Sequence, residues 1–346
     1  MTTIKVKQLI KSHKNVEALI SFAPQTRLWY ANVATTDGIL IIEPDNAYLF
    51  VDSRYIEYAT KKSTNVQVIL LEKNSFKKFL TERKYKEVLV EKEYLLLEQM
   101  EMLQAYLPKI KFKSISGKNL RIKKTNEEIE LVKKAIEISL LSYNKVRNQL
   151  QVGQTEKEVA ALLEYEMQKN GAEKESFESI IAFGPSAAEP HHHPTDRKLK
   201  DGDIVKMDFG AQYNGYAADI TRTFMFGDSS KFDPKLVEII KIVEEAAYKG
   251  IELVKPGIST KEVDKACRDH IKKAGYEKQF LHSTGHGLGI DVHESPNVST
   301  ASETILEPGM IITVEPGIYI QDLGGARLEN DILVTEDGYI NLSKDI

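Results

Sequence analysis

Cysteine is almost absent from this sequence, which has one, Cys267, among 346 residues. A single thiol excludes a disulfide framework and a cysteine-rich zinc site. In the segment "KEVDKACRDHIKKAG", Cys267 falls on the same predicted helical face as Val263 and Ile271. We therefore expect a buried, unreactive side chain at this position.

Long apolar runs and blocks of one charge are also missing. No apolar run approaches the roughly 20 residues needed to cross a bilayer, and the first residues lack the apolar stretch of a signal peptide. The 47 basic and 51 acidic residues nearly cancel, so nothing suggests a nucleic-acid-binding surface. We expect a cytoplasmic protein that acts on a small ligand, with no nucleic acid and no membrane as partner.

The length and the 42% of hydrophobic residues favour two domains. Residues 1 to about 118 alternate short apolar strands, such as "VEALISF", "NVQVIL" and "EVLVE", with helical stretches, which is typical of an α/β domain. A basic, glycine-containing segment, "SISGKNLRIKK", follows. We predict one domain over residues 1–120 and a second over residues 121–346.

The second domain contains an internal repeat. The segments "GQTEKEVAALLEYEMQKNG" (153–171) and "GISTKEVDKACRDHIKKAG" (257–275) have the same length, share "KEV" and end on glycine. Three helices, the first running to about Leu150, are predicted to open with a capping box, in which a hydroxyl residue is followed three positions later by glutamate. These pairs are Thr125 with Glu128, Thr155 with Glu158, and Ser259 with Glu262.

The repeat extends to acidic residues in predicted strands. "LKDGDIVKMDFG" (199–210) aligns without gaps on "LEPGMIITVEPG" (306–317), which places Asp208 on Glu315, each in the core of a buried strand. After a turn, each copy returns in a strand that carries a further acid, Asp219 or Glu329. Two copies packed about a pseudo-twofold axis would bring the four carboxylates together.

Four carboxylates in an apolar interior repel one another, so they need cations. Any one of these acids alone is more simply explained as a turn cap or as the partner of a lysine. The four together favour a pair of metal ions, because Arg222 and Arg327 are too few to neutralise them.

Two histidine-containing segments offer nitrogen ligands. In "HSTGHGLGIDVHESP" (282–296), His286 lies between two glycines that allow close backbone approach. A phosphate-binding glycine loop is disfavoured because no helix follows. From the residues alone, His282 and His293 could be hydrogen-bonded core histidines, and "EPHHHP" (189–194) is most simply a solvated loop.

The motifs "PHHHPT", "KMDFGAQYNGYAADITRTF", "HSTGHGLGIDVHE", "TVEPGIY" and "ARLEND" carry a family resemblance. Together they resemble the Xaa-Pro peptidase branch of the pita-bread metallopeptidases, which holds aminopeptidase P, prolidase and, more distantly, methionine aminopeptidase. The likeness covers residues 125–346, while residues 1–118, with "VDSRY", resemble the creatinase-type N-terminal domain. The implied fold is α/β (α+β), a pita-bread domain with a pseudo-twofold repeat plus a smaller α/β domain.

The resemblance also implies a dinuclear metal site. Its five ligands would be Asp208, Asp219, His286, Glu315 and Glu329, with Asp219 and Glu329 bridging the ions. An oxygen-rich shell with one imidazole favours Mn²⁺, with Co²⁺ or Zn²⁺ as alternatives.

Further roles follow from the same likeness. His191 and His293 would be catalytic residues that line the substrate pocket, and Glu315 would transfer a proton. His282 would lie near the imino-acid ring, whereas His192 and His193 match no required position. Arg327, together with Thr221, is expected to support the ligands, and Arg327 also to border the substrate.

The predicted function is metal-dependent hydrolysis of peptides with proline in second position. Asn297 stands where many prolidases carry an arginine for a dipeptide carboxylate, which favours an Xaa-Pro aminopeptidase over an Xaa-Pro dipeptidase. A non-catalytic binding module and a metal-independent hydrolase of the creatinase kind are disfavoured because none of the five implied ligands is substituted. The expected partners are small peptides and a second copy of the chain in a homodimer.

Overall fold

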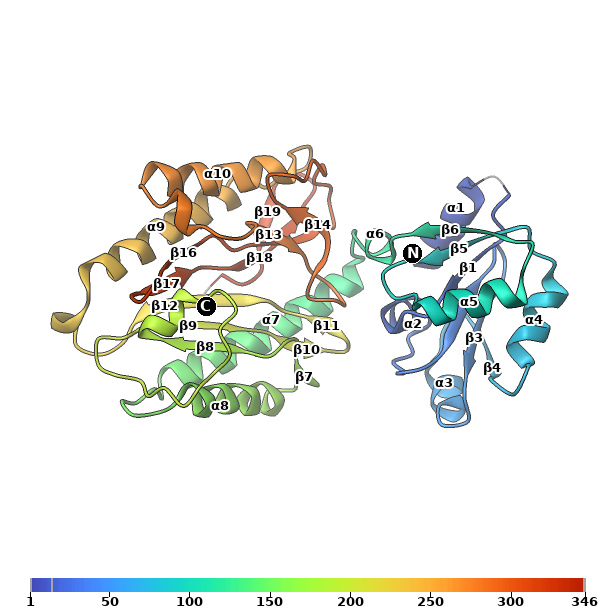
Figure 1. Cartoon of the computed structure of the whole chain (residues 1–346), viewed down its shortest axis with the longest axis horizontal. Coiled ribbons are helices and arrows are strands. Elements are labelled where there is room, and N and C mark those ends of the chain that lie inside the picture. The colour runs from blue at the N-terminus through green and yellow to red at the C-terminus, as the bar shows by residue number, and fades with distance from the viewer. Residues whose placement is uncertain (1, 14, 345–346) are drawn as a thin grey trace. The chain divides into compact units, whose positions relative to one another are not determined.

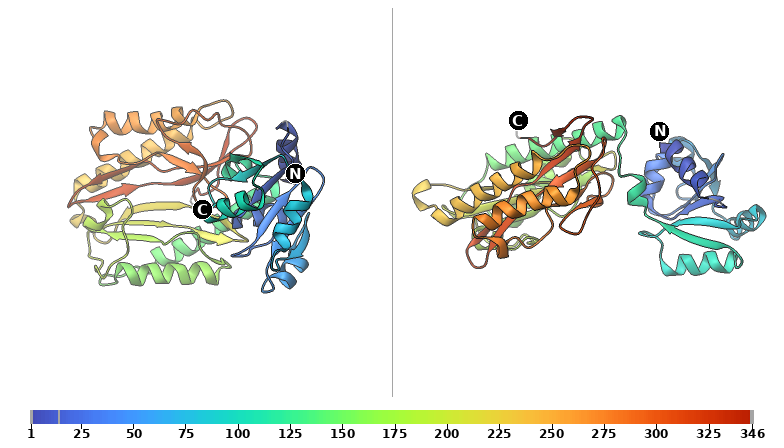
Figure 2. Two further views of the ribbon diagram at one scale, coloured as in Figure 1. Left: turned by 45° about the vertical axis from the view of Figure 1, so that its right-hand side comes forward. Right: turned by 90° about the horizontal axis from the view of Figure 1, so that it is seen from above.

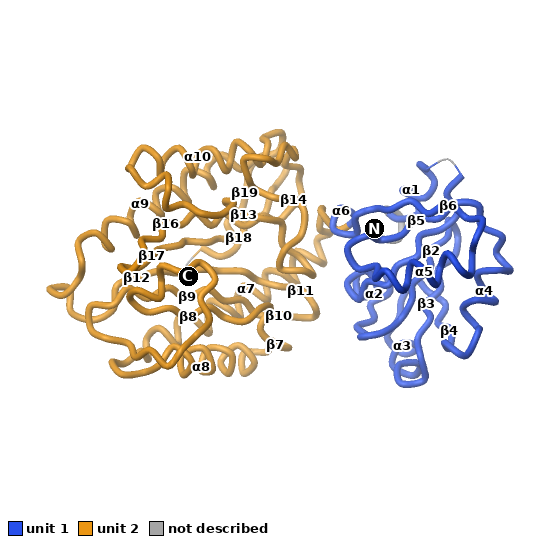
Figure 3. Tube along the Cα trace, viewed as in Figure 1, with its two compact units in different colours: residues 1–120 blue, residues 121–346 orange. Residues whose placement is uncertain are grey.

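The computed structural model of the chain describes residues 2–13 and 15–344. The chain forms two compact units, residues 1–120 and residues 121–346 (Figure 3). Within the described residues, no helix is both long and apolar enough to cross a membrane.

Unit 1 is built on a mixed sheet whose strands, among the described residues, have the order β4-β3-β2-β1-β5-β6. The three strands expected from "VEALISF", "NVQVIL" and "EVLVE" are confirmed as β1, β4 and β5. Phe50, Phe76, Leu80 and Leu103 pack between the sheet and its helices. The strands are β1 (Ala18–Ser21), β2 (Ile39–Ile42), β3 (Ala47–Val51), β4 (Gln67–Leu70), β5 (Glu87–Glu91) and β6 (Lys111–Ile115). The helices are α1 (Thr2–Ser12), α2 (Pro24–Ala31), α3 (Ile56–Lys62), α4 (Ser75–Arg83), α5 (Leu97–Tyr106) and α6 (Gly117–Leu120).

Unit 2 has helices on two outer sides and strands between them, as the views in Figures 1 and 2 agree. The helices are α7 (Asn126–Arg147) and α8 (Glu156–Lys169) on one side, and α9 (Pro234–Ile251) and α10 (Thr260–Lys273) on the other. Tyr143 of α7 stacks on Phe209 with ring centroids 5.1 Å apart. Val243 of α9 and Cys267 of α10 belong to the core that also contains Ile312, and Cys267 is fully buried, as predicted.

The strands between the helices form several antiparallel sheets. The two larger sheets of unit 2 that the described residues form have the orders β12-β9-β8 and β14-β13-β15-β18-β19. Their strands are β8 (Ile180–Phe183), β9 (Ile204–Phe209), β12 (Ile220–Met225), β13 (Gly285–Gly287), β14 (Glu294–Val298), β15 (Ile311–Val314), β18 (Asn330–Val334) and β19 (Tyr339–Asn341). The smaller sheets contain β7 (Lys174–Glu175), β10 (Ala211–Tyr213) and β11 (Tyr216–Ala217), and β16 (Gly317–Ile320) with β17 (Gly324–Arg327). Short 3₁₀ helices are η1 (Gly184–Ala188), η2 (Ser229–Lys231) and η3 (Glu277–Gln279).

The predicted repeat is present in the backbone as well as in the sequence. All three capping boxes form, and α7 ends at Arg147, three positions before the expected Leu150. Each copy also makes the same contact between the turn before its helix and the segment leading to its strand. These equivalent bonds run from the Gly153 N–H to the Leu199 carbonyl, 2.9 Å, and from the Gly257 N–H to the Leu306 carbonyl, 3.0 Å.

The prediction that all four acids lie within strands is wrong. Asp208 lies in β9, but Glu315 follows the end of β15, Asp219 precedes β12, and Glu329 lies between β17 and β18. Pro316 explains the case of Glu315, because a proline has no N–H with which to continue the ladder and restricts the residue before it. Three of the four acids therefore stand where the chain leaves or enters a sheet.

Candidate metal centre

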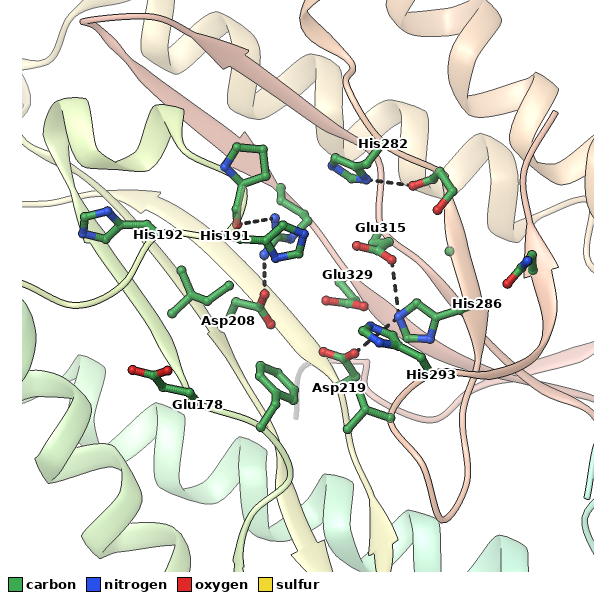
Figure 4. A pocket seen from close by; sticks show the side chains of 18 of the residues that line it. Glu178, His191, His192, Asp208, Asp219, His282, His286, His293, Glu315 and Glu329 are labelled. Atoms are coloured by element: carbon green, nitrogen blue, oxygen red, sulfur yellow. Dashed lines mark hydrogen bonds and ion pairs between the residues drawn. The ribbon is translucent and has the colours of Figure 1, made fainter. Parts of the chain in front are cut away.

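Four carboxylates and His286 converge on a cavity of about 570 Å³ in unit 2 (Figure 4). Among the described residues, their ligand atoms form overlapping groups in which all atoms lie within 4.8 Å of one another. The groups are Asp208 with Asp219 and Glu329; His286 with Glu315 and Glu329; and Asp219 with His286 and His293. The residues predicted as ligands are thus brought together, and His293, predicted to contact substrate, lies beside them.

The short strand β13 sets the position of His286. A Cβ on Gly285 would lie 2.1 Å from the Thr313 carbonyl oxygen, so only glycine allows β15 to approach this closely. His286 Nδ1 lies 3.0 Å from the Gly287 carbonyl oxygen, an acceptor, so Nδ1 carries the proton. Nε2 lies 3.5 Å from Glu315 Oε1, and in the neutral imidazole its lone pair is available to a cation.

Burial raises the pKa of three of the carboxylates, and their neighbours add to the effect. Burial, followed by the neighbouring Glu329, raises the pKa of Asp219 well above its ordinary value. Burial, followed by Glu315, does the same to the pKa of Glu329. Burial raises the pKa of Glu315 to about 7, where Arg327 opposes the shift and Asp208 adds to it. Such a site has excess negative charge that bound cations would neutralise.

The orphaned oxygens of this cluster fit a metal. Within the described part of the chain, Asp208 Oδ1 and Glu329 Oε1 are buried and have no hydrogen-bond partner. The other oxygen of each side chain is held: Arg327 donates to Asp208 Oδ2, and Thr221 donates to Glu329 Oε2 at 2.8 Å. Each carboxylate is therefore oriented by one oxygen and presents the other, which is the arrangement of a metal ligand.

Arg327 connects several walls of the cavity. Its guanidinium donates to Asp208, to Thr221 Oγ1 at 2.9 Å, to the Tyr319 hydroxyl at 2.9 Å and to the Pro190 carbonyl at 3.2 Å. Because these protein groups take four of its five N–H donors, the contacts of Arg327 are those of a residue that supports the ligands. Arg327 also lines the cavity, and its contact with substrate stays a prediction.

His282 is held in a neutral form at the edge of the cavity. Its Nδ1 lies 2.7 Å from the Ser283 carbonyl oxygen, and its Nε2 lies 2.8 Å from the Tyr319 hydroxyl. Burial, followed by the charge of Arg327, lowers the pKa of His282 to about 4. Burial also raises the pKa of Tyr319 to about 12. No role for Tyr319 was predicted from the sequence, although this residue falls within the motif "TVEPGIY".

The consecutive histidines of "EPHHHP" have different environments. His191 is exposed into the cavity and lies above Asp208, whereas His192 is turned away from the carboxylates (Figure 4). His193 is exposed, with Nδ1 3.4 Å from Glu178.

The solvated-loop interpretation is wrong for His192, which is buried. Its Nε2 lies 2.8 Å from Glu156 Oε2 and its Nδ1 lies 3.0 Å from Glu189 Oε2. Glu156, at the start of α8, is itself fully buried and also accepts bonds from Thr195 and Phe183. No local pattern marks this histidine, because its main partner is 36 residues away.

Other cavity residues were not identified from the sequence. Phe177, Glu178 and Val292 line the cavity, together with Asn297, which was predicted from the sequence to border the substrate. Asp331 is buried behind the cluster and accepts the Asp219 N–H at 3.4 Å. The segment "ARLEND" contains Asp331, but nothing in its spacing distinguishes this acid from a surface residue.

Comparisons with known proteins agree with this geometry. Residues 130–336 match metallopeptidase family M24, and residues 5–123 match the creatinase/prolidase N-terminal domain. A putative Xaa-Pro aminopeptidase of Mycoplasma genitalium is 37% identical over 344 residues, which cover 99% of this chain and 96% of the relative. An Xaa-Pro dipeptidase of Pyrococcus furiosus is 41% identical over 315 residues, 89% of this chain and 87% of the relative.

A solved structure of a prolidase is also similar to this chain. The crystal structure of the prolidase from Pyrococcus horikoshii OT3 superposes with a TM-score of 0.93 at 35% identity, covering 100% of this chain and 98% of that one. The predicted pita-bread architecture with a creatinase-type N-terminal domain is confirmed. The chain belongs to metallopeptidase family M24.

Proposed function

We propose that this metallopeptidase hydrolyses the bond before proline in short peptides that carry proline in second position, as an Xaa-Pro aminopeptidase. The observation that carries the proposal is the sharing of ligands. Glu329 belongs both to the group with Asp208 and to the group with His286 and Glu315. Shared carboxylates would suit two adjacent divalent cations, which Asp208, Asp219, His286, Glu315 and Glu329 would hold.

The chemistry is addition of water to the carbonyl carbon and release of the proline nitrogen. A pair of divalent cations bound here supplies Lewis acidity and makes water acidic enough to give hydroxide near neutral pH. Glu315 takes the proton from water and returns it to the proline nitrogen as the carbon–nitrogen bond breaks. As catalytic residues, His191 and His293, which line the cavity, would donate hydrogen bonds to the oxyanion.

The lining of the cavity favours an aminopeptidase over a dipeptidase. Among the described lining residues, Arg327 is the only arginine or lysine, and protein groups engage four of its five N–H donors. Asn297, on the same wall as His293, is neutral. A free carboxylate on proline would lack a cationic partner here, whereas a longer peptide presents a neutral amide at that point.

An Xaa-Pro dipeptidase is the second candidate. The relative from Pyrococcus furiosus, which is 41% identical, carries that name. The proline ring of either substrate would lie near His282.

We take residues 121–346 as the catalytic domain and residues 1–120 as the N-terminal domain. We further propose Mn²⁺ as the physiological metal, with Co²⁺ or Zn²⁺ as alternatives, a homodimer as the assembly and the cytoplasm as the location.

A length series of peptides tests the function. Purified protein, stripped with a chelator and reloaded with Mn²⁺, is assayed on Xaa-Pro, Xaa-Pro-Yaa and Xaa-Pro-Yaa-Zaa, with Xaa-Ala-Yaa as the control. We expect the tripeptide and tetrapeptide to be cleaved with at least about tenfold higher kcat/KM than the dipeptide. Preference for the dipeptide would establish the second candidate, and equal cleavage of the alanine control would reject proline specificity.

A further inference from the structure

A lysine lies fully buried next to the candidate metal centre. Lys206 is in β9, two residues before Asp208, so the alternation of side chains along a strand puts both on the same face. Its ammonium donates to the carbonyl oxygens of Ala187 at 3.2 Å, Glu189 at 2.5 Å and Pro190 at 3.5 Å. It also lies 5.2 Å from the ring centroid of Tyr319.

Burying an ammonium is costly unless hydrogen bonds satisfy it. An apolar side chain at this position of β9 would avoid that cost, so the presence of a lysine here indicates a specific role. The carbonyls that it binds belong to the end of η1 and to the segment directly before His191. Lys206 thus connects the strand that carries Asp208 to the loop that carries His191.

The Pro190 carbonyl is held by a second cation as well. Arg327 donates to this oxygen at 3.2 Å and also to Asp208. The Pro190 carbonyl belongs to the peptide group that joins Pro190 to His191. Two buried basic side chains, Lys206 and Arg327, therefore fix the plane of the peptide group between Pro190 and His191 relative to Asp208.

We infer that Lys206 is a positioning residue, which holds the imidazole of His191 at a set distance from the metal centre. The inference rests on the catalytic role proposed for His191. An imidazole on an exposed loop would otherwise sample many positions, and an error of about 1 Å in a catalytic group can cost on the order of 100-fold in rate. Lys206 itself touches no ligand-presenting oxygen of the cluster.

A double-mutant cycle tests this inference. Lys206→Met, His191→Ala and the double variant are compared with wild type in kcat, KM and metal content, using Mn²⁺ and an Xaa-Pro-Yaa peptide. We expect Lys206→Met to lower kcat about tenfold and His191→Ala about 100-fold, with KM and metal content little changed. In the double variant, kcat should match His191→Ala within about twofold, because Lys206 acts through His191.

Two further variants complete the design. Lys206→Arg keeps a charge and donors, so it should recover most of the lost activity. Lys133→Met removes an exposed lysine on α7, paired to Glu130 at 2.7 Å, and should behave as wild type.

The outcomes are separable. Three results would show that Lys206 has a role other than positioning His191. In the first, the two single-variant losses in kcat multiply in the double variant; in the second, Lys206→Met loses metal. In the third, neither Lys206 variant folds. A wild-type rate in His191→Ala would instead reject the catalytic role of that histidine. Absence of Xaa-Pro hydrolysis by the wild type would reject the proposed function itself.

Discussion

The hydroxyl of Thr221 donates to Oε2 of Glu329 at 2.8 Å, across 108 residues of sequence. Thr221 follows Asp219 by two positions, yet the carboxylate that it orients is the one from the other half of the repeat. Arg327 donates to the same hydroxyl at 2.9 Å and to Asp208. The supports of Glu329 and Asp208 are therefore crossed between the two halves, because each of these carboxylates is oriented by a side chain from the other half.

Thr221→Val removes that support while keeping the shape of the side chain. We expect metal affinity to fall about 10- to 100-fold, because Glu329 loses the bond that directs its free oxygen. Titration of chelator-stripped protein with Mn²⁺, followed by calorimetry, measures the change. Thr223→Val is the matched control, since the Thr223 hydroxyl bonds the backbone of Arg327 and no carboxylate of the cluster. An equal effect in both variants would contradict the assignment of Thr221.

Glu315→Gln should lower kcat by about 10²- to 10⁴-fold, the range for removal of a general acid–base group. The substitution keeps size but removes both a charge and the ability to carry a proton. Steady-state kinetics and elemental analysis are measured together at saturating Mn²⁺. Turnover near wild type with full metal content would show that another group moves the proton.

The histidines around the cavity should separate by metal content. His286→Ala is expected to lose metal, because Nε2 faces Asp219 Oδ2 and Glu315 Oε1 at 3.5 Å each. His191→Ala and His293→Ala should keep metal and lose about 100-fold or more in kcat. The His293 variant tests the distinction between ligand and substrate-contacting residue more strictly, because the ring centroid of His293 lies 4.4 Å from that of His286. Metal loss in the His293 variant would make that residue a ligand.

His192→Ala should destabilise the fold, whereas His193→Ala should not. Loss of His192 removes a buried partner of Glu156, for which about 1–3 kcal/mol in the free energy of unfolding is expected. His193 is exposed, so its removal should change this free energy by less than about 0.5 kcal/mol. Denaturation by urea compares the two variants with wild type. Equal stability of both would return His192 to the solvated-loop interpretation.

His282 should make stability depend on pH in acid. Its pKa falls from 6.5 to about 4 on folding, so between these values the unfolded chain binds more protons. The contribution is fully present above pH 6.5 and is lost as pH falls toward 4, by about 2–3 kcal/mol. His282→Gln removes the titrating ring, so the difference in unfolding free energy from wild type should shift by that amount between pH 7 and pH 4.5. Urea denaturation of chelator-stripped proteins measures this shift, and a constant difference would contradict a neutral His282 in the folded protein.

The sequence by itself determined the features that depend on neighbours along the chain. The capping boxes at Thr125, Thr155 and Ser259 need residues only three positions apart, so the helix starts could be predicted and they form. The repeat could be recognised because two segments of equal length preserve the same spacing. The motifs that contain Asp208, His286 and Glu329 were sufficient to indicate the family, which the comparisons show.

The tertiary structure decided the features that depend on residues far apart in the chain. It placed Glu315 beyond the end of its strand, buried His192 against Glu156, and joined Lys206 to the carbonyls before His191. Strand periodicity gives only the face on which a side chain lies. Packing brings groups from other strands and helices against that side chain. These groups decide whether it is buried, which carboxyl oxygen is held and which is free, and they have no fixed spacing in the sequence.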